Sequence, residues 1–167
     1  LQRDLKKMLT YIIVAEVGYM VGGAWIGSAV GLAGSIYHIL SDGMMTLCLF
    51  MAVGCIIYKT GGSSFENMRG MFKKMPITMV AFVIGAFSMI GIPPTCGFFS
   101  KWYLILGAID TQNWSFMVAL LFSSLINVIL FFRLFEIAYF GDVEDGSADH
   151  SKYKKSEAPK SMLIPLS

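Results

Sequence analysis

Isolated charged residues inside long apolar stretches constrain this chain more than any other feature. Between Thr10 and Ile57, the only acidic or basic side chains are Glu16, His38 and Asp42. Lipid offers no water to backbone polar groups, so apolar stretches of this length are expected to form helices there. The pattern predicts an all-α, polytopic membrane protein in which protein surrounds the buried ionisable groups.

The composition also favours a membrane protein. Hydrophobic residues make up 56% of the chain and charged residues 14%, whereas a soluble domain has about 25% charged residues. The net charge of +2 comes without a long basic run, so we expect no nucleic-acid partner. Cys48, Cys55 and Cys96 lie at unpaired spacings in apolar sequence, which predicts neither a disulfide framework nor a zinc site. Phosphate-binding loops and haem or iron–sulfur motifs are absent from the sequence, so we expect no cofactor.

Five apolar segments predict about five transmembrane helices, including one that is broken by proline. A helix needs about 20 apolar residues to cross about 30 Å of hydrocarbon, and we expect each of the first three segments to do so. The segments are residues 8–24, 28–58, 76–92, 98–109 and 114–140.

The boundaries suggest a bundle over residues 1–141, followed by a polar loop over residues 142–167 that leads to a missing helix. The chain begins in polar sequence without Met and stops where apolar sequence resumes. We therefore expect an internal or carboxy-terminal fragment of a longer subunit, embedded in the lipid bilayer of a cell (inner) membrane.

The fourth segment follows a proline pair. Pro93 and Pro94 have no backbone N–H to donate, and Gly97 adds backbone freedom. Membrane interiors tolerate non-helical backbone where it is buried in protein or lines a wet cavity, and broken helices often lie at transport sites. These three residues predict the hinge of a broken helix.

Lys101 is the most informative single residue, because it stands in the apolar sequence FFSKWYLIL directly after this break. A charged lysine inside the bilayer costs at least about 2.5–3.5 kcal/mol. One interpretation is a lysine that extends its ammonium group to the membrane surface. The interpretation we favour is a proton carrier, because burial disfavours the charged form and promotes release of the proton.

His38, Asp42 and Thr46 are spaced four residues apart, which predicts one polar face of a helix. On this face His38 and Asp42 are expected to pair. A single polar residue often only joins two membrane helices, whereas three in register favour a hydrated path. Two candidate ligands fall short of a metal site.

Glu16 and a pair near the end of the last segment complete the intramembrane charges. Glu16 is either a protonated carboxyl group that bonds to a neighbour or a member of a proton path. Arg133 and Glu136 are three residues apart and are expected to pair in a structural role. Gly31 and Gly34 are expected to permit close helix packing.

Four stretches of the chain carry a family resemblance, and together they cover about residues 2–140. They are QRDLKKMLTY followed by VGYM, then SIYHILSDGMMTLCLFMAVG, KKMPITMVAFVIGAFSMIGIPPTCGFFSKWYL and SSLINVILFFRLFEIAYF. The chain resembles the antiporter-like, proton-translocating subunits of respiratory complex I (the NADH-quinone oxidoreductase membrane arm) and the D-type subunits of Mrp-type cation/proton antiporters. The block from GIPP to Lys101 is its most specific part.

The resemblance implies a subunit built from two inverted helical bundles, of which this chain would be the second. Lys101 matches the family's functional lysine on the broken helix, and His38 matches a relay histidine. Lys6 matches a lysine proposed for the relay, although its sequence position also suits a basic anchor at the membrane surface.

The chain departs from the family pattern at three positions. Thr46 stands where many members have a lysine, and Asp42 stands where many have a histidine or another polar group. Glu16 stands where glutamine is common. The resemblance therefore implies a relay that is rerouted through carboxylates or partly lost.

The function we expect is translocation of protons, or of protons and monovalent cations, in a complex I-like, hydrogenase-like or Mrp-like assembly. Other membrane subunits would be the partners, and their electron transport or ion gradients would drive the change in protonation. The alternative is a non-conducting scaffold subunit of the same kind of complex. A separate intramembrane enzyme is disfavoured, because the sequence offers no nucleophile–base pair or metal constellation.

Overall fold

The computed structural model describes residues 3–140, and over this range the chain is helical with no strand. The predicted all-α membrane fold is confirmed. The polar loop predicted for residues 142–167 lies outside the described residues. The helices are α1 (Leu5–Trp25), α2 (Ala29–Thr60), the short 3-10 helix η1 (Phe65–Met68), α3 (Met71–Lys74), α4 (Pro76–Ile90), α5 (Cys96–Asp110) and α6 (Trp114–Phe140).

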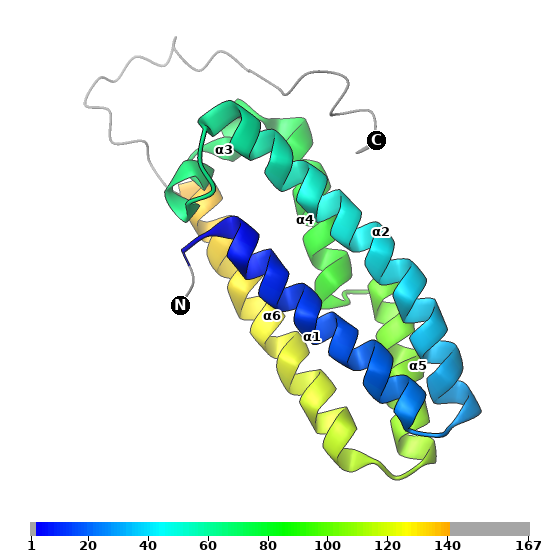
Figure 1. The fold of residues 1–167 in the computed structure, drawn as a ribbon. Helices are drawn as coiled ribbons and strands as arrows, with labels where there is room; N and C mark the ends of the chain where they lie inside the picture. The colour runs from blue at the N-terminus through cyan, green and yellow to red at the C-terminus, as the bar shows by residue number, and fades with distance from the viewer. Residues whose placement is uncertain (1–2, 141–167) are drawn as a thin grey trace, which may run out of the picture.

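Three of these helices are long and apolar enough to cross a membrane by themselves. They are α1, α2 and α6, with 21, 32 and 27 residues. The expectation that the third segment crosses alone is wrong, because α4 has 15 residues and is about 22 Å long at 1.5 Å per residue. In Figure 1, α5 continues in the direction of α4 after a short break, so the two together form one broken crossing.

The break between α4 and α5 is confirmed at the predicted place. Gly91 ends α4 in the left-handed conformation, with φ of 90°, and Pro93 and Pro94 follow it. Gly97, predicted as part of the hinge, instead lies inside the first turn of α5. There it allows close packing, since a Cβ atom on Gly97 would come within 1.9 Å of the Ser88 carbonyl oxygen.

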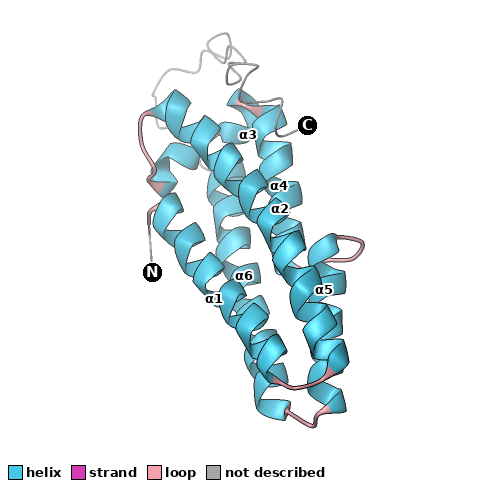
Figure 2. Cartoon of the chain, turned by 45° about the vertical axis from the view of Figure 1, so that its right-hand side comes forward, coloured by secondary structure: helices cyan, strands magenta, loops and turns pink. Residues whose placement is uncertain are grey.

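The helices run side by side in an elongated bundle, as Figures 1 and 2 show. The start of α1, the end of α2, η1, α3 and the end of α6 gather at one end of the bundle. The connections from α1 to α2 and from α5 to α6 lie at the opposite end. At the first end, the segment before α1 is tied to the connection after α2, because Leu5 donates to the Ser63 carbonyl at 2.8 Å and Phe65 donates to the Arg3 carbonyl at 2.9 Å.

Close approach of α2 and α5 depends on glycine, as the small residues in the sequence predicted. A Cβ atom on Gly107 of α5 would lie 2.5 Å from the Gly31 Cα of α2. A Cβ atom on Gly34 would lie 2.9 Å from the Leu104 amide nitrogen. Any larger side chain at these positions would push the two helices apart, so the glycines set the distance between α2 and α5.

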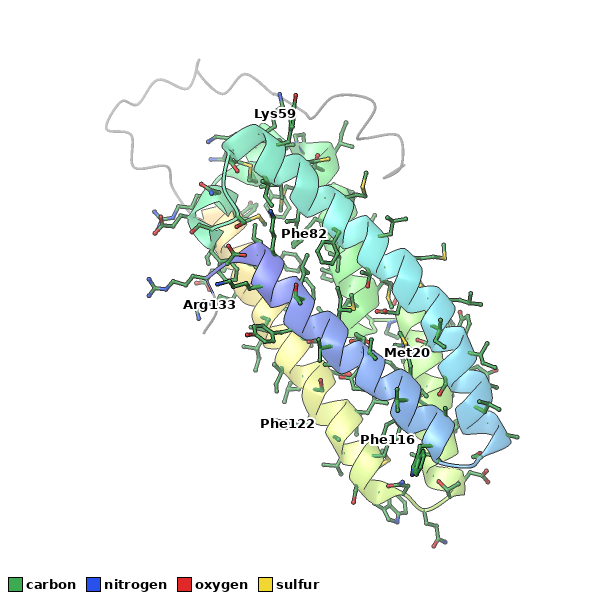
Figure 3. All side chains as sticks on the ribbon, in the orientation of Figure 1. Met20, Lys59, Phe82, Phe116, Phe122 and Arg133 are labelled. Atoms are coloured by element: carbon green, nitrogen blue, oxygen red, sulfur yellow. The ribbon has the colours of Figure 1, made fainter. Side chains whose placement is uncertain are left out.

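The apolar side chains divide between the centre of the bundle and its outer surface. Phe82 is fully buried in a core that α1, α2, α4 and α6 share, and it packs edge-on against Phe131. Phe122 is largely exposed and points away from the bundle in Figure 3. Exposed apolar residues on all the long helices are what a lipid-facing surface requires.

Candidate functional site

The site is centred on Glu16, a fully buried carboxylate near the middle of α1. Its Oε1 accepts hydrogen bonds from Lys101 Nζ at 3.1 Å and from Asn127 Nδ2 at 3.2 Å. Its Oε2 lies 2.9 Å from His38 Nε2. Glu16 therefore joins α2, α5 and α6 through side chains that stand far apart in the sequence.

Lys101 reaches Glu16 from the second turn of α5 and is 5% exposed. Its ammonium group also donates to the Met89 carbonyl oxygen at 2.6 Å. Met89 is in the last turn of α4, where backbone carbonyls lack partners within the helix. The break between α4 and α5 thus supplies a backbone acceptor as well as room for the lysine side chain.

His38 occupies a fully buried position on α2, with Ser100 beside one ring nitrogen and Glu16 beside the other. Its Nδ1 lies 2.9 Å from the Ser100 hydroxyl, and that hydroxyl donates to the Gly97 carbonyl at 3.0 Å. With Ser100 donating to the Gly97 carbonyl, an N–H at Nδ1 of His38 that donates to Ser100 satisfies both side chains. Nε2 of His38 and Oε2 of Glu16 lie 2.9 Å apart, a close charge contact that is not aligned as a hydrogen bond.

Within residues 3–140, His38 and Asp42 form no direct hydrogen bond or ion pair, so their predicted pairing is limited to a longer-range interaction of charge. Both His38 nitrogens are engaged by Glu16 and Ser100, whereas Asp42 accepts from Thr46 at 3.3 Å. Spacing by four residues did place the three side chains on one face of α2, but facing helices decide which groups meet. Asp42 remains buried one turn from His38.

The other predicted site residues lie outside the cluster. Lys6 is exposed in the first turn of α1, about 15 Å from Glu16 along the helix axis. Pro93 and Pro94 lie in the break, where their side chains are exposed. Arg133 and Glu136 are exposed on α6, and within residues 3–140 they form no ion pair with each other, contrary to expectation.

Sequence reasoning missed three contributors to the site: Ser100, Asn127 and the Met89 carbonyl. Asn127 is a buried amide inside the most apolar stretch of α6, which was the available signal. Ser100 precedes Lys101 directly, and a single serine is too common in membrane helices to mark a site. The Met89 carbonyl leaves no signal in the sequence, because any residue at the end of α4 would offer it.

The chemistry available here is proton exchange. One carboxylate stands between an amine and an imidazole, and each contact is a hydrogen bond or an ion pair. Within residues 3–140 no three histidine, cysteine or acidic side chains gather as metal ligands do. Breaking a buried ion pair by removal of one partner costs about 3–5 kcal/mol, so each of these charges depends on the others.

Comparison with known proteins gives a consistent result. The family described as "NADH:quinone oxidoreductase/Mrp antiporter, TM" matches residues 1–127. A protein named NADH-quinone oxidoreductase subunit N from Desulforudis audaxviator (strain MP104C) is 42% identical over 99% of this chain and 34% of its own length. A putative antiporter subunit mnhD2 from Staphylococcus aureus (strain Mu3 / ATCC 700698) is 30% identical over 98% of the chain and 32% of its own length.

Two solved structures share the fold. In the Mrp complex from Dietzia sp. DQ12-45-1b, one chain superposes with a TM-score of 0.81 at 26% identity, covering 84% of this chain and 26% of that one. In the membrane-bound sulfane sulfur reductase, an archaeal respiratory membrane complex, the TM-score is 0.84 at 26% identity, covering 99% and 33%. The chain thus spans about a third of the length of the curated relatives it matches. This chain belongs to the NADH:quinone oxidoreductase/Mrp antiporter transmembrane family.

Proposed function

We propose that this chain carries protons, or exchanges protons for monovalent cations, within an antiporter-like membrane subunit. The observation that carries the proposal is the bridging carboxylate of Glu16, which contacts Lys101 with one oxygen and His38 with the other. A carboxyl group can accept a proton on one oxygen while it releases one from the other. Glu16 is therefore suited to pass protons between the two basic groups.

The transfer begins with Lys101 as an ammonium group and a proton shared between Glu16 and His38. When Lys101 gives a proton to Oε1, the shared proton moves from Oε2 to Nε2 of His38. The ammonium becomes an amine, Glu16 becomes a neutral carboxylic acid, and His38 becomes an imidazolium. Asp42, one turn further along α2, is the next carboxylate that can receive the proton.

The names of the relatives support a role inside a larger assembly. A relative named for NADH-quinone oxidoreductase and another named for an antiporter suggest partner subunits of a complex I-like or Mrp-like complex in the cell membrane. In such a complex the partner subunits would supply the redox energy or ion gradient. A change of charge on a partner subunit near the Glu16 cluster would then favour proton transfer in one direction along the cluster.

The second candidate is a non-conducting scaffold, and Thr46 favours it. Thr46 donates its hydroxyl hydrogen bond to Asp42 at 3.3 Å, so no cationic group stands at this position of α2. In that case Glu16, His38 and Lys101 would form a static network that only joins helices.

Glu16→Gln in the full-length subunit separates the two candidates. Glutamine keeps the size and can still accept from Lys101 and Asn127, but it cannot carry a proton. We expect proton transport by the assembled complex to fall by at least about tenfold, because a positioned proton-transfer group typically contributes about 10²–10⁴-fold. Glu66→Gln, at an exposed carboxylate of η1, is the control. Wild-type transport by an assembled Glu16→Gln complex would support the scaffold.

A further inference from the structure

Tyr19 lies one turn after Glu16 on α1 and borders the cluster. Its ring centroid is 5.4 Å from Lys101 Nζ and 5.9 Å from the His38 ring centroid. The residue is 6% exposed, and its phenol oxygen is fully buried. Among residues 3–140 this oxygen has no protein group in hydrogen-bonding geometry.

A second buried hydroxyl faces it from α6. Ser123 and Ser124 are the side chains that interact with the Tyr19 phenol. The Ser124 oxygen is also buried and, in the part of the chain that the structure describes, also lacks a direct hydrogen bond. Ser124 lies three residues before Asn127, so both stand on the face of α6 that meets α1.

These groups form a polar seam of two levels between α1 and α6. At the first level Asn127 donates to Glu16, and at the second level Tyr19 faces the two serines. Buried hydroxyl groups nearly always bond to protein or to ordered water. A buried water needs two to four polar partners, and the second level offers two buried hydroxyls, of Tyr19 and Ser124, that have no direct hydrogen bond in residues 3–140.

We propose that Tyr19, Ser123 and Ser124 bind a buried water molecule that extends the Glu16 cluster along the seam between α1 and α6. The water lies on the side of Glu16 that leads to the connections 26–28 and 111–113. The argument for the water itself rests only on the buried hydroxyl groups. Its part in proton transfer rests on the proposed function, because it would hand protons between the cluster and that end of the bundle.

Apolar side chains close the seam beyond this water. Leu104 and Leu120 pack against Tyr19, and Phe116 packs beside them. Figure 3 shows Phe116 near the end of the bundle that holds the connection to α6. Phe116 fits because Gly22 has no side chain, and a Cβ atom there would lie 2.3 Å from the ring. The structure therefore holds the proposed water away from that membrane surface, and this apolar layer must open for a proton to pass.

X-ray hydroxyl-radical labelling of the intact complex tests for the water directly. Radicals formed from a bound water modify the nearest side chain even when bulk solvent cannot reach it. In H₂¹⁸O we expect ¹⁸O-labelled Tyr19, whereas Phe82, an aromatic residue buried in an apolar core, stays unlabelled. Ser124→Ala should reduce labelling of Tyr19 at least about threefold. Labelling of Tyr19 no greater than that of Phe82, or labelling that Ser124→Ala leaves unchanged, would overturn the water site.

Tyr19→Phe tests whether the water takes part in transport. The ring and its contact with Lys101 remain, and only the hydroxyl is lost. We expect proton transport to fall about fivefold in an assembled complex, with Tyr37→Phe, at a residue on the outer face of α2, as the control. Labelled Tyr19 together with wild-type transport in Tyr19→Phe would refute the extension of the relay. The labelling experiment tests the water site independently of the Glu16→Gln transport experiment, which tests the proposed function. Either proposal can therefore fail while the other holds.

Discussion

At the scale of single residues, Ser100 fixes the orientation of His38, the proton acceptor in the proposed relay. Its hydroxyl accepts from Nδ1 of His38 and donates to the Gly97 carbonyl, which leaves Nε2 facing Glu16. Without this partner the ring can turn, or the proton can move to the other nitrogen. The protonation of His38 therefore depends on a residue that never contacts Glu16.

We expect Ser100→Ala to slow proton transport several-fold and to shift its pH profile, because the His38 tautomer is no longer fixed. Transport by the assembled full-length complex, measured from pH 5 to pH 8, checks this. Ser35→Ala is the matched control, since Ser35 is a buried serine of α2 that donates to the Gly31 carbonyl outside the cluster. An unchanged pH profile in Ser100→Ala would remove its positioning role.

Asp4 joins the start of α1 to the loop before η1. It accepts from the Lys7 amide at 3.1 Å and from the Ser63 hydroxyl. The Ser63 hydroxyl, followed by the Lys7 amide, holds the pKa of Asp4 below its usual value of 3.8. The lowered pKa means that these contacts stabilise the fold above pH 3.8 and are lost as the pH falls through the lower pKa.

Asp4→Ala should therefore speed hydrogen exchange of the Leu5 and Phe65 amides, which cross between these two segments. In the wild type, exchange corrected for its intrinsic pH dependence should be equal at pH 7 and pH 5. Asp4→Asn should stay close to wild type, since asparagine caps a helix about as well. Faster exchange in the wild type at pH 5 than at pH 7 would contradict this assignment.

The sequence predicted which ionisable residues are buried but not which of them meet. Isolated charges in apolar segments pointed to Lys101, His38 and Glu16, because lipid tolerates such groups only under constraint. Their contacts with one another, Ser100 and Asn127 join positions 22 to 111 residues apart. Local spacing carries no information at that range, and for this reason Asp42 was expected as the partner of His38.

At the scale of helices, the broken crossing places Lys101. The first turn of α5 packs directly on the backbone of α4, and Gly97 makes this possible. The contact fixes the distance from the end of α4 to Lys101 and brings the Met89 carbonyl to its ammonium group. Prolines in the sequence predicted the break, but not this contact, which depends on how the two helix ends overlap.

Gly97→Ala is expected to destabilise the protein, because the new methyl group would collide with the Ser88 carbonyl. Overpacking of this kind costs about 1–3 kcal/mol. Gly18→Ala is the matched control, since Gly18 is a helical glycine with nothing within 4 Å, and alanine there should gain about 0.5–1 kcal/mol. Thermal unfolding of the purified full-length subunit measures both. Equal unfolding temperatures for the two variants would contradict the close packing.

At the scale of the whole molecule, charge divides the two ends of the bundle. The end that holds the start of α1 and the connection after α2 carries seven basic residues: Arg3, Lys6, Lys7, Lys59, Arg69, Lys73 and Lys74. The connections at the other end, residues 26–28 and 111–113, contain none. Lysine and arginine favour the cytoplasmic side of a membrane, so the basic end is expected to face the cytoplasm. In the sequence alone, the count of lysine and arginine already favours the cytoplasmic side for residues 59–75, but the lysines after Phe140 and the missing helices leave the orientation open.

Cysteine labelling tests the orientation. In a background without native cysteines, Lys73→Cys should react with a membrane-impermeant maleimide only in inverted vesicles. Gln112→Cys, in the exposed connection before α6, should react only in right-side-out vesicles. The reverse pattern would place the basic end outside and reverse the direction of the proposed relay.

The central claim is that Lys101 gives up its proton to Glu16 during transport, and Lys101→Arg tests it most directly. Arginine keeps the positive charge and can reach the carboxylate, but it stays protonated in any protein environment. We expect Lys101→Arg to lower proton transport in the assembled full-length complex at least about tenfold, nearly as far as Lys101→Met. Lys59→Arg, at the exposed end of α2, should transport like the wild type. Wild-type proton transport in an assembled Lys101→Arg complex would contradict the proposed transfer, because Lys101 would then be a fixed charge.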